Sequence, residues 1–147
     1  MNPTDFLDLA ARLVPSGTEA AFRTAVSRAY YGAFHTAVLL IKELGVALPV
    51  GPESHQKVRY CLMESGEAMG LQAGISLQIL RQHRNQADYD LDKSSEFDAK
   101  RALQRIERAR GILDLLQKCR EEPARTRFRF KLRSYAANVL RLPVTDL

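Results

Sequence analysis

The segment that decides the fold spans residues 19–44 and reads EAAFRTAVSRAYYGAFHTAVLLIKEL. One set of its apolar residues recurs every three or four positions, the period of an α-helix with a buried face: Phe22, Val26, Ala29, Ala33, Ala37, Leu40 and Leu44. A second set widens this face to most of the circumference: Tyr30, Phe34, Val38 and Ile41. A helix this long, with most of its sides apolar, is expected at the centre of a helical bundle.

The rest of the first 122 residues predicts further helices around this central one. Gly45 is a typical residue after a helix end, and the Pro and Gly residues in 15–17 and 49–52 mark connections. Further helices are predicted at residues 4–13, 54–64 and 70–89, and from about residue 99 to the break at 121–123. Thr4 is the predicted cap of the first of these helices, and Ser95 with Asp98 forms a predicted capping box before the last. We therefore expect an all-α fold, an up-and-down bundle of four to five helices within residues 1–122.

Residues 123–147 form a basic C-terminal segment with a mixed pattern. Phe128, Phe130 and Leu132 alternate with arginine and lysine, as in a β-strand, whereas residues 134–142 have a helical pattern. Because no other segment offers a strand to pair with, we expect a basic helix that docks on the bundle or on a partner.

Positive charge is concentrated in two places. The chain has 147 residues and a net charge of +5. One cluster lies on the predicted helix that begins near residue 99, at Arg101, Arg105 and Arg108. The other lies in the C-terminal segment, at Arg125, Arg127, Arg129, Lys131 and Arg133. Each cluster is either a solvated surface or a surface for phosphate groups.

Several functional classes lack their motifs in this sequence. It contains no glycine-rich phosphate loop, no zinc-protease or serine-hydrolase motif, and no carboxylate pair at metal-binding spacing, so we expect neither a metal nor a cofactor. Cys61 and Cys119 fit no metal-binding spacing and are expected to be reduced, packed thiols. We find no targeting segment and no apolar run of membrane-spanning length, and we expect a soluble, cytoplasmic protein that does not bind membranes.

Arg84 is the most informative residue for function. It occupies a core-facing position in the apolar stripe of predicted helix 70–89, whose other members are Ala73, Leu77, Leu80, Ala87 and Leu91. An arginine at such a position is costly unless an anion pairs with it. Three partners are open: Asp88 one turn away, a second copy of the chain, or a bound phosphate.

A second polar stripe lies on the central helix. Arg28, Tyr31 and His35 are spaced three and four residues apart, so they share one face. If the two helices pack antiparallel, this face meets Arg84 and Asp88. One interpretation is a buried polar network in which Arg28 or Tyr31 bonds to Asp88. The other is a phosphate pocket lined by the two arginines, with Tyr31 or Tyr89 bonding or stacking.

The remaining two histidines carry less weight. His83 is adjacent to Arg84 but about 100° around the helix, so it is expected to point elsewhere. His55 lies at a predicted helix start, where we expect a neutral, solvated ring.

Two motifs together resemble the HEPN superfamily. Residues 27–35 read SRAYYGAFH, and residues 84–90 read RNQADYD. They resemble the SRAYYAxFH and RNxADY helices of a branch of small prokaryotic HEPN proteins, and residues 54–58 (SHQKV) resemble the segment between them. The resemblance covers roughly residues 20–116.

This resemblance implies a four- to five-helix bundle that forms a homodimer. Many HEPN proteins are metal-independent ribonucleases of toxin–antitoxin, phage-defence or CRISPR systems, often paired with a minimal nucleotidyltransferase that acts as antitoxin. Their site, shared across the dimer, uses an arginine followed four to six residues later by a histidine. Arg84 matches this arginine, and Asn85 matches the polar residue after it.

The sequence departs from that pattern at Tyr89, which occupies the place of the histidine. A phenol is a poor proton acceptor at neutral pH, where histidine works well. The first hypothesis is therefore a non-catalytic module of a toxin–antitoxin or defence system that binds nucleotide, RNA or a nucleotidyltransferase partner. The alternative is an endoribonuclease in which Arg84 stabilises the scissile phosphate, Tyr89 and Asn85 position the substrate, and His35 is the base.

Overall fold

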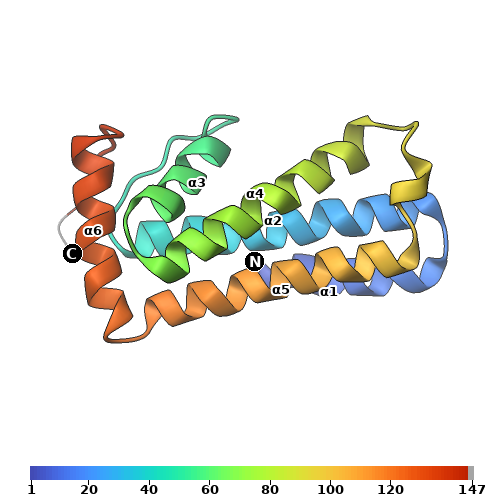
Figure 1. Cartoon of the computed structure of the whole chain (residues 1–147), viewed down its shortest axis with the longest axis horizontal. Coiled ribbons are helices and arrows are strands. Elements are labelled where there is room, and N and C mark those ends of the chain that lie inside the picture. Colours follow the sequence, from blue (N-terminus) through green and yellow to red (C-terminus); the bar gives the residue numbers. More distant parts are fainter. Residues whose placement is uncertain (146–147) are drawn as a thin grey trace.

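The computed structural model describes residues 1–145, and helices account for nearly all of its regular structure (Figure 1). Within residues 1–145, six α-helices follow one another: α1 (Thr4–Leu13), α2 (Glu19–Glu43), α3 (Ser54–Glu64), α4 (Ala68–Tyr89), α5 (Ala99–Arg120) and α6 (Ala124–Asn138). Short 3₁₀ turns, η1 (Val14–Ser16) and η2 (Ser94–Glu96), precede α2 and α5. The expected all-α helical bundle is confirmed.

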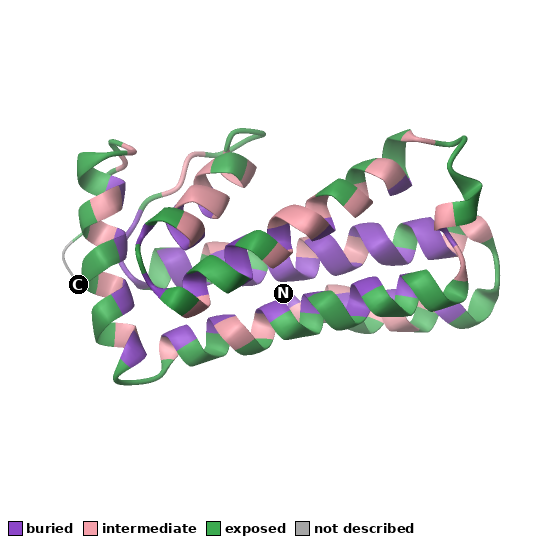
Figure 2. Ribbon diagram, in the orientation of Figure 1, coloured by how far each residue is buried: buried purple, intermediate pink, exposed green. Residues whose placement is uncertain are grey.

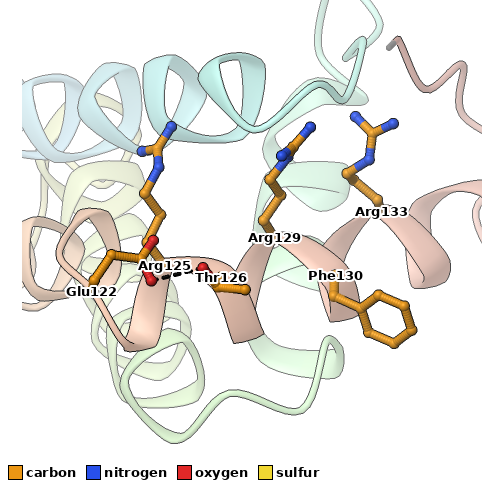
Figure 3. Close-up of a pocket in the computed structure, with 6 residues that line it drawn as sticks. All are labelled: Glu122, Arg125, Thr126, Arg129, Phe130 and Arg133. Carbon is orange, nitrogen blue, oxygen red and sulfur yellow. Dashed lines mark hydrogen bonds between the residues drawn. The ribbon is translucent and has the colours of Figure 1, made fainter. Parts of the chain in front are cut away.

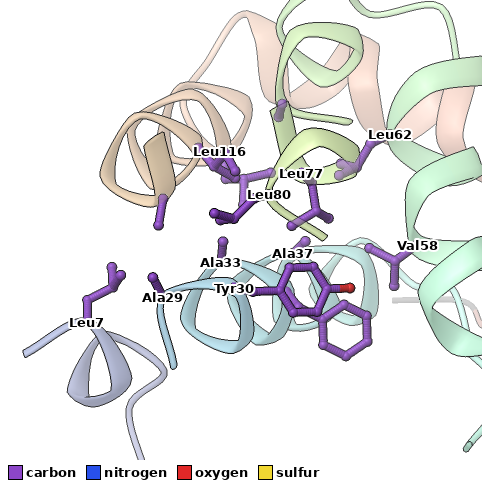
Figure 4. Close-up of a cluster of buried hydrophobic side chains, with 14 of the residues drawn as sticks. Leu7, Ala29, Tyr30, Ala33, Ala37, Val58, Leu62, Leu77, Leu80 and Leu116 are labelled. Carbon is purple, nitrogen blue, oxygen red and sulfur yellow. The ribbon is translucent and has the colours of Figure 1, made fainter. Parts of the chain in front are cut away.

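The long helix α2 is the centre of the bundle. Helices α1, α4 and α5 pack along it, and α3 and α6 lie at one end (Figure 1). Both sets of apolar residues predicted for α2 are buried except Val38, which is half-buried (Figure 2). Gly32 lets α1 approach closely, since a Cβ atom there would lie 3.1 Å from Cγ of Leu7. In Figure 4, Tyr30, Ala33 and Ala37 of α2 are part of the same buried cluster as Leu77 and Leu80 of α4.

Helix ends follow local hydrogen bonding, and three predictions about them were wrong. Thr4 is the first residue of α1 and does not cap it; Pro3 precedes the helix, and Asn2 Oδ1 accepts from the Thr4 amide at 3.0 Å. Asp98 itself caps α5 by accepting from the Arg101 amide at 2.8 Å, and Ser95 lies outside that helix in η2. Leu91 follows the end of α4 and is 73% exposed, so it does not extend the buried stripe.

The basic C-terminal segment is helical over residues 124–138 and packs on the bundle, and its last two residues lie outside the described ones. Helix α6 buries Phe128, Leu132 and Ala136 against the core and contacts α3 and α5. The alternating pattern near Phe128 therefore does not form a strand. The backbone then returns to the end of α2, where Val46 and Val144 form an isolated β-bridge. Arg133 supports this return by donating to the carbonyl oxygens of Leu44 and Thr145.

No helix in the described part of the chain is long and apolar enough to cross a membrane. Cys61 and Cys119 are buried free thiols, as expected, and burial raises the pKa of each, to about 12 and about 11. Within residues 1–145, no group of three or more histidine, cysteine or acidic side chains is arranged to hold a metal ion.

Candidate functional site

The C-terminal end of α4 is held against the start of α2 by a buried arginine. Helices α2 and α4 run in opposite directions (Figure 1), which places Arg23 of α2 beside the last turn of α4. Its guanidinium donates to the carbonyl oxygens of Gln86, Ala87 and Asp90 at 3.0–3.1 Å. It also lies 4.2 Å from the Phe97 ring centroid. These contacts give the Ala87 carbonyl a donor and add a second one to Gln86 and Asp90, which also accept from the Asp90 and Lys93 amides. They hold the last turns of α4, which carry Arg84 and Asp88, against α2.

Arg84 pairs with Asp88 of its own helix. Arg84 Nε lies 2.9 Å from Asp88 Oδ2, and the two side chains are 16% and 29% exposed. The contact is an ion pair rather than a hydrogen bond, because the Nε–H is not aligned with the carboxylate. Ser27 Oγ donates to the same carboxylate oxygen at 3.3 Å, and Arg84 Nη1 donates to Asn85 Oδ1 at 3.1 Å. Within residues 1–145, the partners of Asp88 are thus Arg84 and Ser27, and not Arg28 or Tyr31.

Aromatic rings surround the two arginines that the sequence singled out. The Arg84 guanidinium carbon lies 5.2 Å from the Tyr31 ring centroid and 5.6 Å from that of Tyr89. The Arg28 guanidinium carbon lies 5.1 Å from the Tyr31 centroid. At such distances the negative face of an aromatic ring attracts a cation. We refer to Arg28, Tyr31, Arg84, Asp88 and Tyr89 as the Tyr31 cluster.

The Tyr31 cluster brings together five of the predicted site residues and leaves part of its surface open. Tyr89 is 70% exposed at the end of α4. Asn85 is exposed and touches the cluster through Arg84. An open tyrosine beside two cations can stack a base while the cations attract phosphate.

His35, predicted as a base, lies on the edge of this cluster. Its ring centroid is 6.0 Å from those of Tyr31 and Phe6 and 5.2 Å from that of Phe34. Desolvation, and then the charge of Arg28, lowers the pKa of His35. The ring borders a cavity of about 390 Å³ that Arg84 does not line. Tyr31 contacts both His35 and Arg84, and no direct contact joins those two side chains in the described part of the chain.

His55 is the residue that the sequence analysis missed. Its Nδ1 lies 2.6 Å from the hydroxyl of buried Tyr30, and its ring stacks on Phe34 with centroids 4.3 Å apart. Desolvation, followed by the charges of Arg81 and Arg84, lowers the pKa of His55 to about 4. The predicted solvated ring is therefore wrong. The available signal was Tyr30, whose hydroxyl in an apolar stripe requires a hydrogen-bonding partner.

His83 points away from the Tyr31 cluster, as predicted. It borders a separate cavity of about 350 Å³ whose other lining residues lie on α5: Arg101, Gln104, Arg105 and Arg108. Arg105 and Arg101 pair with Glu96, and Arg108 donates to Ser76 at 3.1 Å. This arginine stripe thus takes part in contacts within the bundle.

Comparison of the chain with protein-family models gives no match, and comparison with curated proteins and with solved structures gives none either.

Proposed function

We propose that this chain is a HEPN-type RNA-binding module of a prokaryotic toxin–antitoxin or defence system, working without the arginine–histidine ribonuclease pair. The observation that carries the proposal is the arrangement of Arg84. Its charge is balanced by Asp88, and its guanidinium lies near the rings of both Tyr31 and Tyr89. A guanidinium already held by a carboxylate is better suited to a stable binding surface than to stabilising charge that develops only during a reaction.

RNA is the ligand that this surface fits best. Tyr89 offers an exposed ring for a base, and Arg28 adds a cation that has no carboxylate partner in the described part of the chain. Stacking on an aromatic ring tolerates any base, and phosphate contacts add affinity that depends on salt. The alternative ligands are a free nucleotide and a nucleotidyltransferase partner. A homodimer of this chain would carry two Tyr31 clusters.

One observation favours a second candidate, a metal-independent endoribonuclease. His55 lies close enough to Arg84 to be affected by its charge, and its pKa of about 4 leaves the ring neutral at pH 7. A neutral imidazole can accept the proton of a ribose 2′-hydroxyl, but a pKa of about 4 makes this ring a weaker base than an ordinary histidine, which counts against the candidate. In this candidate His55 takes the role that the sequence analysis gave to His35, and Arg84 stabilises the phosphate.

The two candidates differ in what induced expression does to a bacterial host. For the binding module we expect no growth arrest from well-expressed protein. We expect Tyr89→Ala to weaken binding of a labelled RNA about tenfold, because one stacked base is lost. The matched control is Tyr60→Ala, since Tyr60 lies on α3 outside the cluster. Arrest that His55→Gln relieves, at equal soluble level, would contradict the binding module and establish the ribonuclease.

A further inference from the structure

Helix α6 presents a row of arginines at the end of the bundle away from Tyr89. Arg125, Arg129 and Arg133 are four residues apart and extend from the same side of the helix in Figure 3. Four residues rise about 6 Å along an α-helix, so the side chains form a row along its axis. The row borders a cavity of about 220 Å³, lined also by Glu122, Thr126 and Phe130. Because the opposite face of α6 is packed into the core, the row is held in place.

Two of these arginines have no carboxylate to balance them. Within residues 1–145, no ion pair joins Arg125 or Arg129 to an acid, and Arg129 Nε is buried without a hydrogen-bond partner. The carboxylate of Glu122 accepts a hydrogen bond from Thr126 Oγ1 at 2.7 Å. Residues 123–145 contain six lysines and arginines and no acid. An anion entering the cavity would therefore gain from charge that the described structure does not balance.

The other cations of α6 are engaged with the bundle. Arg127 Nε lies 3.5 Å from the buried carboxylate of Glu67, and Lys131 donates to the carbonyl oxygen of Gly66 at 3.2 Å. Helix α6 thus has one basic side, with Arg127 and Lys131, that holds it to the rest of the protein. Its cavity side carries Arg125 and Arg129, together with Arg133, which donates to Leu44 and Thr145. Arg127 and Lys131 carry the same charge as Arg125 and Arg129 but lie on another side of α6. Substituting them therefore provides a matched control.

Phe130 lies about 100° around α6 from Arg129, and in Figure 3 its ring extends away from the three guanidinium groups. It is 77% exposed, although it borders the same cavity as Arg125 and Arg129. Exposure of so large an apolar side chain beside arginines is typical of surfaces that bind single-stranded nucleic acid, where bases stack and phosphates pair. An acidic peptide would use the charges but would leave the ring without a specific role.

We propose that Arg125, Arg129 and Phe130, the α6 strip, bind single-stranded nucleic acid independently of the Tyr31 cluster. The arginines contact neighbouring phosphates, each presenting the planar donor fork that suits a phosphate group. Phe130 stacks on a base. Since none of these contacts reads the 2′-hydroxyl, oligouridylate and oligodeoxythymidylate should bind with similar affinity.

The test is fluorescence anisotropy with labelled oligouridylate over a range of salt concentrations. Arg125→Gln/Arg129→Gln removes two charges from the strip, and Arg127→Gln/Lys131→Gln removes two from the other side of the same helix. We expect the strip variant to bind at least about tenfold more weakly and its salt slope to fall by about 1.4, or roughly 0.7 for each lost phosphate contact. The control should keep the slope. Phe130→Ala should weaken binding about tenfold, and Phe130→Tyr should restore it.

Three results would overturn the proposal. One is equal loss in the two double variants, with melting curves showing that both are folded, because affinity would then follow net charge alone. The second is unchanged affinity in Phe130→Ala. The third is strip-dependent binding of polyglutamate as tight as that of oligouridylate, which would assign the surface to an acidic protein. Tyr89→Ala, measured in parallel, reports on the Tyr31 cluster separately, so failure of one surface is distinguishable from failure of the other.

Discussion

Arg84 in the Tyr31 cluster and Arg129 on α6 are both half-buried arginines, and their surroundings differ. A carboxylate lies 2.9 Å from Arg84, whereas Arg129 has no acidic partner among residues 1–145. Arg84 is 16% exposed, so little water reaches its charge and a carboxylate of the protein balances it. Arg129 borders an open cavity on α6, where solvent can do this, so an arginine there can remain available to a ligand. Removing arginines one at a time tests this comparison.

Arg23→Ala should have the largest effect. Arg23 is 7% exposed and donates to three carbonyl groups at the end of α4. Its loss leaves the buried Ala87 carbonyl without a donor, takes a second donor from those of Gln86 and Asp90, and opens a cavity beside Phe97, so we expect the free energy of unfolding to fall by about 3 kcal/mol. Urea unfolding followed by circular dichroism measures this. Arg110→Ala, which alters an exposed arginine of α5, is the control, and a loss below about 1 kcal/mol would show that water replaces these contacts.

Arg84→Ala should have a smaller effect, although the same helix is involved. The partner left behind, Asp88, is 29% exposed and keeps its hydrogen bond from Ser27, so its carboxylate is partly solvated. We expect a loss of about 1–2 kcal/mol, between that of a surface pair and that of a fully buried pair. The double variant Arg84→Ala/Asp88→Ala should recover part of it. If the double variant is no more stable than Arg84→Ala, the pair does not balance charge as argued here.

These two arginines also show what the sequence could and could not predict. The partner of Arg84 lies four residues away on its own helix, and helical periodicity is enough to suggest it. Arg23 lies four residues from Glu19 and looks like half of an ordinary surface pair, which it also forms at 2.9 Å. Its main role depends on carbonyl groups 63 to 67 positions further along the chain. No local pattern contains that information.

Dependence on residues far apart in the sequence also explains where the other predictions agree with the structure and where they do not. The central position of α2 was predictable because its apolar period runs through 25 residues. The environment of His55 was not, because a ring at a helix start is solvated unless another element covers it, and here Tyr30 and Phe34 do. The segment that forms α6 is ambiguous in sequence, because alternation of apolar and basic residues fits a strand and also a helix with one narrow buried stripe.

Protonation of His55 gives a third, smaller test. The pKa of His55 is lowered in the folded protein from 6.5 to about 4, so the folded state favours the neutral ring. Stability from this residue is complete above the unfolded pKa and is lost as the pH falls from about 6.5 towards 4. We expect a loss of about 1 kcal/mol over that window, because water screens this partly exposed ring. Unfolding curves of the wild type and of His55→Gln between pH 7 and pH 4 measure the part of this loss that is due to His55. Parallel curves would show that His55 is not desolvated.

The control for this last series is His83→Gln. Desolvation, and then the charges of Arg105 and Arg108, also lowers the pKa of His83, but His83 faces the α5 cavity and not the Tyr31 cluster. The His55→Gln/His83→Gln double variant should therefore show the sum of the two acid effects, because the sites share no partner.

Arg125→Ala should have the smallest effect on stability and therefore completes the comparison. Arg125 has no ion pair in the described part of the chain, and its side chain borders open space. We expect the free energy of unfolding to change by less than about 0.5 kcal/mol, or to rise slightly, since repulsion from Arg129 is removed. Unfolding at low and high salt distinguishes the two outcomes, because salt screens that repulsion. A loss above about 1 kcal/mol would instead assign Arg125 to the structural contacts of α6, and the contrast with Arg84 would disappear.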